Sequence, residues 1–561
     1  FADPYIRQPN PHLDDRLKKS STGSGTFAAI KVASKKNKKS ALSGGRPIDL
    51  KQIREKYINM NHEHSAASPE TTGRNADKGA LVAALQRILP AEAVLFDQED
   101  LSPYECDGLS AYRQLPLVVV IPDSIEEVQK VMRLCHSKNI PVVARGTGTG
   151  LSGGALPLAD GVVLSLARLK SILHVDPEQR IARVQPGVRN LAISEVAQPY
   201  GLYYAPDPSS QIACTIGGNI AENAGGVHCL KYGLTVHNVL QIKVVTVDGE
   251  LVTIGSEALD SPGYDLLALM IGSEGMLGIV VEITVKLLPM PERAQVVLAA
   301  FDDVEKAGTA VGEIIAAGII PAGLEMMDGP AIQAAEDFAH AGYPTDAAAI
   351  LLCEVDGSNE EVSEHILAVR SLLKQCGATD VRSARDETER LLFWKGRKSA
   401  FPAVGRISPD YYCMDGTIPR HRLPEVLKRT AELSREYGLQ VANIFHAGDG
   451  NMHPLILYNA NNPGELERTE ELGGRILEIC VAVGGTITGE HGVGIEKINQ
   501  MCVQFEKDEL EQFRAIKRAF DPQDLLNPGK GVPTPRRCSE YRALQPRDTG
   551  SERVSGGESA A

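Results

Sequence analysis

The chain has 561 residues, 43% of them hydrophobic and 23% charged, which is typical of a globular protein with two or three domains. Its ten cysteines include no Cys-x-x-Cys pair. This argues against an iron–sulfur cluster, a zinc ribbon or a disulfide framework, and favours a reducing compartment. We find neither an apolar run long enough for a membrane helix nor a signal-peptide pattern, so we expect a protein of the cytoplasm.

Positive charge is concentrated at the N-terminal end. Residues 1–60 hold thirteen Lys and Arg against five Asp and Glu, so the rest of this chain of net charge −14 carries about −22. The segment is rich in Ser, Gly and Lys and has little apolar periodicity. We therefore expect residues 1–75 to be a disordered basic arm, a solvated tail rather than a tether to nucleic acid or membrane.

Ordered elements are expected from about residue 76. A helical pattern covers 81–89 and a strand pattern covers 117–121, after which Ser124 predicts the N-terminus of a helix. The β-branched run at 141–144 predicts a buried strand. Farther along, Asp248-Gly249 predicts a hairpin turn.

The strand at 141–144 leads into a loop, residues 145–154, with five glycines and three hydroxyl residues. Glycine permits positive φ angles and close backbone approach to a ligand, and successive free N–H groups form a site for anions. A Rossmann fingerprint does not fit, because no apolar helix follows the last glycine, and no Gly-Lys-Ser/Thr of a P-loop follows. An ordinary glycine-rich loop is the alternative; we interpret the loop as a diphosphate cradle.

Further motifs follow this loop in order. They are Pro206–Ser210, Thr215–Gly226, Lys231–Gly233 and Gly272–Ile279. Together with the loop, they resemble the flavin domain of the vanillyl-alcohol oxidase/p-cresol methylhydroxylase superfamily. The resemblance covers roughly residues 80–532. It is strongest to the FAD-linked group that contains the flavin subunits of bacterial glycolate oxidases and the D-lactate and D-2-hydroxyglutarate dehydrogenases.

The resemblance implies an α+β fold with a two-subdomain FAD-binding domain, a ferredoxin-like α+β cap and a C-terminal helical segment. Together with the breaks in the sequence pattern, the resemblance divides the chain into five parts. They are an arm (1–75), the FAD-binding domain (76–290), the cap (291–485), a segment returning to the FAD domain (486–532) and a disordered tail (533–561).

The resemblance also implies which residues contact FAD. They are Arg145, Gly146, Thr147, Gly148, Thr149, Gly150, Ser152, Gly153, Pro208, Ser209, Ser210, Thr215, Gly218, Asn219, Ala224, Gly225, Glu274, Ile279 and Asn527. Since no histidine occurs between residues 137 and 173, we expect the FAD to be noncovalent.

A second signal is a pair of histidines, His446 and His453, separated by the turn residues Gly448–Asn451. Strands over 441–446 and 452–458 would form a hairpin that brings both imidazoles to one site. A later glycine-rich loop adds Glu490. Two histidines and a carboxylate with an open position form a catalytic metal set that suits zinc best, with manganese and iron left open.

A lone histidine is more often an ordinary polar residue than a ligand, but the resemblance supports the functional interpretation. It implies that His446, His453 and Glu490 bind the metal and that His491 is the general base. The metal would acidify the substrate hydroxyl, and hydride would pass to flavin N5. Arg397 would bind the substrate carboxylate, with a surface arginine as the alternative, and Asn451 would add a hydrogen bond.

The hydroxyglutarate enzymes carry a threonine and a lysine where this chain has Phe401 and Tyr411–Met414. This apolar region favours a small (R)-2-hydroxy acid, glycolate or D-lactate. The resemblance further implies partner subunits, one of them an iron–sulfur protein, that carry electrons toward quinone and could hold the chain at the inner face of the membrane. A homodimer also stays open.

Two other functions are alternatives to the oxidation of a small hydroxy acid. The first is a non-redox FAD enzyme of the alkylglycerone-phosphate synthase type, against which the absence of a lipid-binding or peroxisomal signal argues. The second is a non-catalytic flavin subunit of an oxidase complex, against which the complete set of His446, His453, Glu490 and His491 argues.

Overall fold

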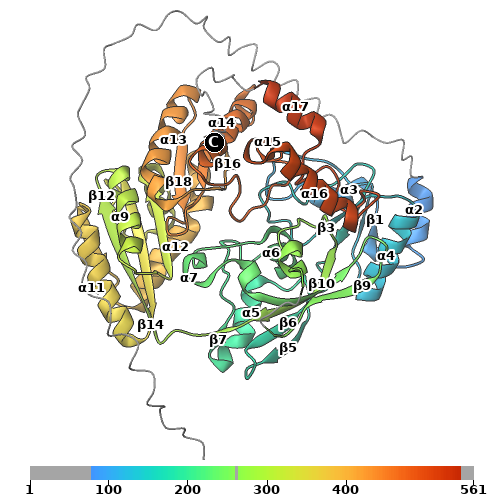
Figure 1. Ribbon diagram of the computed structural model, residues 1–561, viewed down its shortest axis with the longest axis horizontal. Helices are drawn as coiled ribbons and strands as arrows, with labels where there is room; N and C mark the ends of the chain where they lie inside the picture. Colours follow the sequence, from blue (N-terminus) through green and yellow to red (C-terminus); the bar gives the residue numbers. More distant parts are fainter. Residues whose placement is uncertain (1–76, 259–262, 545–561) are drawn as a thin grey trace, which may run out of the picture. The chain divides into compact units, whose positions relative to one another are not determined.

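The computed structural model in Figure 1 describes residues 77–258 and 263–544. The predicted basic arm lies outside the described residues. The described chain begins with α2 (Lys78–Leu85), where the Asp77 side chain accepts hydrogen bonds from the backbone of Gly79 and Ala80. No helix of the described ranges combines the length and the apolar character that a membrane crossing needs.

The first subdomain contains a four-stranded sheet in the order β1-β2-β4-β3, in which β2, β4 and β3 are parallel. Its strands are β1 (Val94–Leu95), β2 (Val118–Val120), β3 (Val142–Arg145) and β4 (Val162–Ser165). The helix predicted from Ser124 is α4 (Ile125–Ser137), and Ser124 Oγ accepts from the Glu127 N–H at 3.2 Å. Both predicted strands and this helix are confirmed.

The second subdomain is a five-stranded antiparallel sheet in the order β5-β6-β10-β8-β9. Its strands are β5 (Ile172–Asp176), β6 (Ile181–Val184), β8 (Val239–Val245), β9 (Leu251–Gly255) and β10 (Ile279–Lys286). The predicted turn at Asp248-Gly249 joins β8 to β9, and Gly249 takes a φ of 82°, which glycine adopts without steric cost. Helices α5 (Asn190–Ala197) and α6 (Ile216–Glu222) lie between β6 and β8 in the chain.

The cap is a seven-stranded antiparallel sheet in the order β15-β12-β14-β13-β18-β20-β16. Its strands are β12 (Arg293–Phe301), β13 (Gly323–Asp328), β14 (Ala349–Gly357), β15 (Asp380–Ser383), β16 (Asp410–Cys413), β18 (Val441–Phe445) and β20 (Pro454–Tyr458). The hairpin predicted around the two histidines is confirmed, since β18 pairs with β20.

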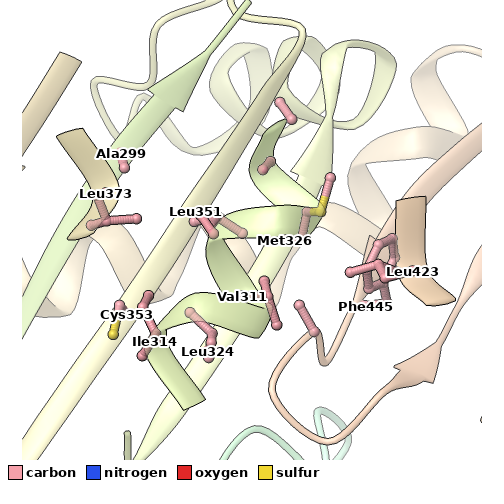
Figure 2. Close-up of a cluster of buried hydrophobic side chains, with 14 of the residues drawn as sticks. Ala299, Val311, Ile314, Leu324, Met326, Leu351, Cys353, Leu373, Leu423 and Phe445 are labelled. Carbon is pink, nitrogen blue, oxygen red and sulfur yellow. The ribbon is translucent and has the colours of Figure 1, made fainter. Parts of the chain in front are cut away.

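Helices cover both faces of the cap sheet, so its strands are apolar on both sides. One face packs against α9 (Val304–Ala316), α11 (Asn359–Gln375) and α13 (Leu423–Tyr437), and Figure 2 shows this core. The other face packs against α10 (Gly329–Ala339) and α12 (Glu387–Ala403). Successive residues of β12 alternate between the two cores, with Val297 in the first and Leu298 in the second.

The C-terminal segment lies against the FAD domain. After α14 (Glu465–Ala482) and α16 (Lys507–Phe520), Leu526 forms a parallel bridge with Val142 at the edge of β3. The Val142 N–H donates to Leu525 O at 2.7 Å, and the Asn527 N–H donates to Val142 O at 2.9 Å. This pairing carries the residues after α16 to the base of the glycine-rich loop.

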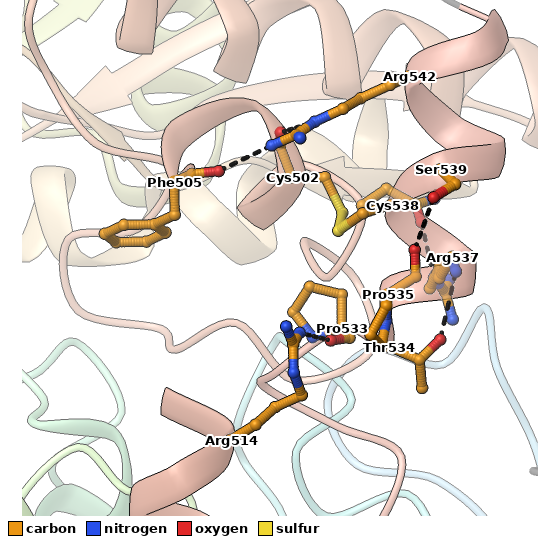
Figure 3. Close-up of a disulfide and its surroundings, with 11 residues drawn as sticks. Cys502, Phe505, Arg514, Pro533, Thr534, Pro535, Arg537, Cys538, Ser539 and Arg542 are labelled. Atoms are coloured by element: carbon orange, nitrogen blue, oxygen red, sulfur yellow. Dashed lines mark hydrogen bonds between the residues drawn. A yellow bond between two sulfur atoms is a disulfide. The ribbon is translucent and has the colours of Figure 1, made fainter. Parts of the chain in front are cut away.

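One expectation about the C-terminus is wrong, and a disulfide there was not predicted. The tail expected to be disordered from residue 533 forms α17 (Pro535–Leu544), and Cys502 is disulfide-bonded to Cys538 of that helix (Figure 3). The Tyr541 hydroxyl is buried and donates to Glu478 at 2.7 Å. The two cysteines stand 36 residues apart without a recognisable spacing, so the sequence did not reveal their pairing. Residues 545–561 lie outside the described ranges.

Replacing Cys538 by Ser is expected to lower the free energy of unfolding by about 2–4 kcal/mol, because the bond closes a long loop in the unfolded chain. Thermal and denaturant unfolding with and without a reductant would measure this. The reductant should destabilise the parent protein but not the variant. Cys376→Ser, at a free and partly buried cysteine, is the matched control. A parent protein unaffected by reductant would contradict the prediction.

Candidate active site

A cavity of about 510 Å³ lies where loops of the FAD domain meet the cap. Most of the residues predicted to contact FAD line it, namely Arg145, Gly146, Thr147, Gly148, Thr149, Gly150, Pro208, Ser209, Ser210, Thr215, Gly218, Asn219, Ala224, Glu274 and Ile279. Its volume is in the range of cofactor sites.

The loop is shaped for close approach of a ligand. A Cβ on Gly146 would stand 2.3 Å from Thr215 Oγ1, so only glycine fits there, and Gly148 has a φ of 74°. Thr215 Oγ1 is itself buried and has no hydrogen-bond partner among the described residues. The glycine backbone of this loop and the buried Thr215 hydroxyl, which has no hydrogen-bond partner among the described residues, are features suited to binding a flavin nucleotide.

Four residues predicted to contact FAD do not line the cavity: Ser152, Gly153, Gly225 and Asn527. Two of them, Asn527 and Ser152, contact residues of the cavity wall without facing the cavity. The Asn527 amide donates to Gly154 O at 2.9 Å and to Glu274 O at 2.8 Å, and Ser152 O accepts from the Ile495 N–H at 3.0 Å. They therefore position the glycine-rich loop against the C-terminal segment.

The lining also contains charged residues that sequence reasoning missed: Asp107, Glu222 and Lys398. Glu222 belongs to a motif that was recognised, and Lys398 follows Arg397 directly, but nothing in the spacing distinguished either residue from its neighbours. Asp107 comes from the irregular segment before β2, where no periodicity or turn motif predicted a structural element.

The predicted metal ligands converge at the cap side of the cavity. His446 Nε2 lies 3.2 Å and His453 Nε2 3.3 Å from the same oxygen, Glu490 Oε1. In a tetrahedral site with bonds of about 2.0–2.1 Å, ligand atoms stand roughly 3.3 Å apart. His453 and Glu490 line the cavity, and His446 lies buried behind them. The three side chains thus fit one divalent metal.

The pairing of β13 with β18 places Glu325 beside His446. Met326 of β13 is opposite Phe445 of β18, which sets Glu325 opposite His446. Both Glu325 oxygens lie 2.8–3.0 Å from His446 Nδ1, and Glu325 is 1% exposed. A carboxylate at Nδ1 fixes the proton there and leaves Nε2 free as a ligand. Although burial opposes ionisation of Glu490, the neighbouring His446, His453 and His491 lower its pKa to about 2.

A second group, Asp415, His453 and His491, also has metal-binding side chains close together. Asp415, however, is fully buried and its oxygens are already occupied. They accept from Thr488 Oγ1 at 2.6 Å, Asn451 Nδ2 at 2.8 Å, the His491 N–H at 2.9 Å and Lys497 Nζ at 3.0 Å. Burial alone would raise the pKa of Asp415, but Lys497 holds it well below the usual range. Asp415 therefore serves as a structural anchor, and the His446 group is the metal site we favour.

Replacing Asp415 by Ala is expected to lower the free energy of unfolding by about 3–5 kcal/mol. The substitution breaks a buried ion pair and leaves the buried Lys497 ammonium without the Asp415 carboxylate. Thermal and denaturant unfolding of metal-free protein would measure this. Asp302→Ala is the control, since the Asp302–Lys306 pair is exposed and should not change the melting temperature. Equal melting temperatures for both variants would refute the anchor role.

The predicted catalytic residues divide into one that lines the cavity and two that do not. His491 lines it, and its buried Nδ1 has no hydrogen-bond partner among the described residues. Burial is the main cause that lowers the pKa of His491 to about 4, so the imidazole is a neutral proton acceptor near pH 7. Asn451 lies behind, with Oδ1 2.7 Å from His453 Nε2.

Arg397 is 0% exposed and does not line the cavity. Its Nη2 forms an ion pair with Glu325 Oε2 at 2.6 Å, and none of the three guanidinium nitrogens has a hydrogen-bond partner among the described residues. In this conformation the guanidinium supports Glu325, and through it His446. Direct contact of Arg397 with substrate stays a prediction.

Of the apolar residues expected near the substrate, Phe401 lines the cavity, with its ring centroid 6.0 Å from that of His453. Tyr411 and Cys413 instead line a separate cavity of about 140 Å³, and Tyr412 and Met414 lie in a buried cluster. The prediction of an apolar wall thus holds in this structure for Phe401 only.

Two family models match the chain: an FAD binding domain over residues 116–255 and the C-terminal domain of FAD linked oxidases over residues 290–531. The glycolate oxidase subunit GlcD of Escherichia coli (strain K12) is 65% identical over 470 residues, 84% of this chain and 94% of the relative. A D-lactate dehydrogenase of Anaerostipes hadrus is 33% identical over 460 residues, 80% of this chain and 96% of the relative.

Among solved structures, p-cresol methylhydroxylase with substrate bound has a TM-score of 0.71 at 18% identity, covering 82% of this chain and 97% of that one. This likeness confirms the expected fold. The chain belongs to the FAD-linked oxidases. It is an FAD-dependent oxidoreductase.

Proposed function

We propose that the chain oxidises a small (R)-2-hydroxy acid, glycolate or D-lactate, to the 2-oxo acid with noncovalent FAD and a divalent metal. The observation that carries this is the convergence of His453, Glu490 and His491 on one wall of the flavin cavity. Bound FAD supplies a two-electron acceptor for the substrate hydride. A metal held by His446, His453 and Glu490, zinc first and manganese or iron as alternatives, supplies a Lewis acid for the hydroxyl.

The protein's own groups then divide the remaining work. His491 Nδ1, buried and free of other hydrogen bonds in the described residues, takes the hydroxyl proton of the substrate. Glu325 holds the proton of His446 on Nδ1. Asp415 orients the backbone of the loop that carries Glu490 and His491, and it also holds the Asn451 amide. Phe401 and Pro402 exclude water from the region beside His453.

The choice of substrate rests on size and on the relatives. Phe401 leaves an apolar surface where a second carboxylate of a longer substrate would be unpaired. Relatives named as a glycolate oxidase subunit and a D-lactate dehydrogenase support the same two substrates. The word subunit in the first name supports a complex, and we propose an iron–sulfur partner that takes electrons toward quinone, at a peripheral site on the membrane.

The test is reduction of dichlorophenolindophenol by the isolated, metal-loaded chain with glycolate, D-lactate or L-lactate. We expect the dye to bleach with glycolate and D-lactate and much more slowly with L-lactate. A yellow protein that bleaches the dye with none of them would instead support the non-catalytic flavin subunit. Turnover of an acylglycerone phosphate would support the non-redox alternative.

A further inference from the structure

A carboxyl group without a hydrogen-bond partner lies in the wall of the flavin cavity. It belongs to Glu222, the last residue of α6, which lines this cavity. Its Oε2 is buried and has no hydrogen-bond partner among the described residues. A buried carboxylate that accepts no hydrogen bond is costly, so the group needs a proton, a ligand or both.

Two glycines place Glu222 between the glycine-rich loop and the loop that carries Glu490 and His491. A Cβ on Gly154 would stand 2.8 Å from Glu222 Oε1, and a Cβ on Gly492 would stand 2.0 Å from Glu222 Oε2. The absence of a side chain at both positions therefore leaves the space that this carboxyl group occupies. Because Gly492 directly follows His491, Glu222 lies on the side of the cavity where the proposed base is.

The direction of α6 separates Glu222 from the nucleotide end of the cavity. At the start of the helix, a Cβ on Gly146 would stand 2.3 Å from Thr215 Oγ1 and 4.0 Å from the Gly218 nitrogen. Glu222 ends the helix, about 10 Å farther along its axis. The redox-active ring of FAD has to lie near His491, because hydride passes from the substrate to that ring. Glu222 is therefore at the ring end of the cavity.

The surroundings of Glu222 favour its neutral form. Burial is the main cause that raises the pKa of Glu222 well above the usual range. The carboxyl groups of Glu274 and Asp107 raise this pKa further, while Lys497 and Lys530 act in the opposite direction. Both ammonium groups are engaged with other partners, Lys497 with a carboxylate of the cap and Lys530 with backbone carbonyls.

The negative charge of this group of carboxyls belongs on Glu274 instead. Its two oxygens accept from the N–H groups of Val493 and Gly494, both at 2.7 Å. Burial raises the pKa of Glu274 as well, but these two hydrogen bonds oppose the rise, because they stabilise the carboxylate. Glu222 has no such donors, so it retains its proton and is an O–H donor in the cavity wall.

We propose that Glu222 is a neutral carboxylic acid that donates a hydrogen bond to the isoalloxazine ring of FAD and stabilises the negative charge that reduction places on the ring. This inference rests on the proposed function, which places the ring near His491. Hydride transfer adds two electrons and one proton to the ring, so the acceptor atoms of the ring become more negative. A donor that binds the reduced ring more strongly than the oxidised ring raises the midpoint potential of the flavin.

The test compares Glu222→Met, which removes the donor at nearly the same side-chain length, with Glu222→Gln, which is neutral and keeps an N–H donor. Glu126→Met, at an exposed position in the first turn of α4, is the control. The readout is the midpoint potential of the bound flavin near neutral pH, from titration with dithionite against a reference dye. FAD content and melting temperature are measured alongside.

For Glu222→Met we expect the equilibrium between oxidised and reduced flavin to shift about tenfold toward the oxidised form, which is about 30 mV for a two-electron couple. Glu222→Gln and Glu126→Met should stay within about threefold of the parent. An unchanged potential in Glu222→Met with full FAD content would overturn the proposal. A higher potential in Glu222→Gln would overturn it too, because the parent would then carry an ionised carboxylate beside the flavin.

A second measurement decides the matter if Glu222→Met fails to bind FAD. The infrared difference spectrum between electrochemically reduced and oxidised parent protein should contain a carboxylic acid C=O band that shifts on reduction and is absent from Glu222→Gln. A parent spectrum without such a band would overturn the proposal. Neither measurement uses a hydroxy acid. Both therefore test the role of Glu222 even if no hydroxy acid reduces the protein and the proposed function fails.

Discussion

Replacing His491 by Gln is expected to lower the rate of flavin reduction by hydroxy acid about 10²- to 10⁴-fold, the usual contribution of a general base. The side chain lines the flavin cavity beside His453, and its Nδ1 has no other partner among the described residues. Because Gln cannot accept the proton but fills a similar space, FAD and metal content should stay near those of the parent. Stopped-flow measurement of flavin bleaching gives the rate directly.

The control for this variant is His421→Gln, at an exposed histidine just before α13. It should reduce flavin at the parental rate. If His491→Gln retained more than about a tenth of the parental rate with full FAD content, another group would have to accept the hydroxyl proton.

The second large effect is expected from Glu490→Gln. Removing this charge leaves two imidazoles around the metal site, so we expect loss of most bound metal and a fall in flavin reduction of about 10³-fold, corresponding to several kcal/mol of Lewis-acid stabilisation. Elemental analysis of the purified protein measures the metal independently of activity. Adding excess zinc or manganese should restore little.

Glu432→Gln, at an exposed position of α13, removes the same charge away from the site and should change neither metal content nor rate. Full metal occupancy in Glu490→Gln would mean that the ion is held by another set, and Asp415 with His453 and His491 would then be the group to test.

The sequence predicted those parts of the site whose residues lie close together along the chain. The glycine-rich loop at 145–154 and the pair His446 and His453 each lie within a dozen residues, so local spacing indicated their geometry. Glu325 and Asp415 could not be recognised, because each reaches the site through pairing with segments far along the chain: β13 with β18, and Asp415 with the loop before Glu490. Their importance depends on tertiary contacts.

The same limit applies to α12 and to the C-terminal tail. Arg397 and Lys398 are adjacent in sequence, and only the rotation of α12 shows that the first faces Glu325 and the second the cavity. Helix α17 is polar in composition, and a few contacts, including those of Cys538 and Tyr541, hold it in place. Composition therefore predicted disorder where the structure has an ordered helix.

The most direct test is an anaerobic titration of the metal-loaded protein with glycolate, D-lactate, L-lactate and D-2-hydroxyglutarate, followed in the visible flavin band. We predict bleaching by glycolate and D-lactate, little response to L-lactate or the dicarboxylate, and loss of the response after EDTA treatment. A yellow protein that none of these acids reduces would contradict the hydroxy-acid dehydrogenase function of this chain, and bleaching that survives complete metal removal would contradict the role of the metal.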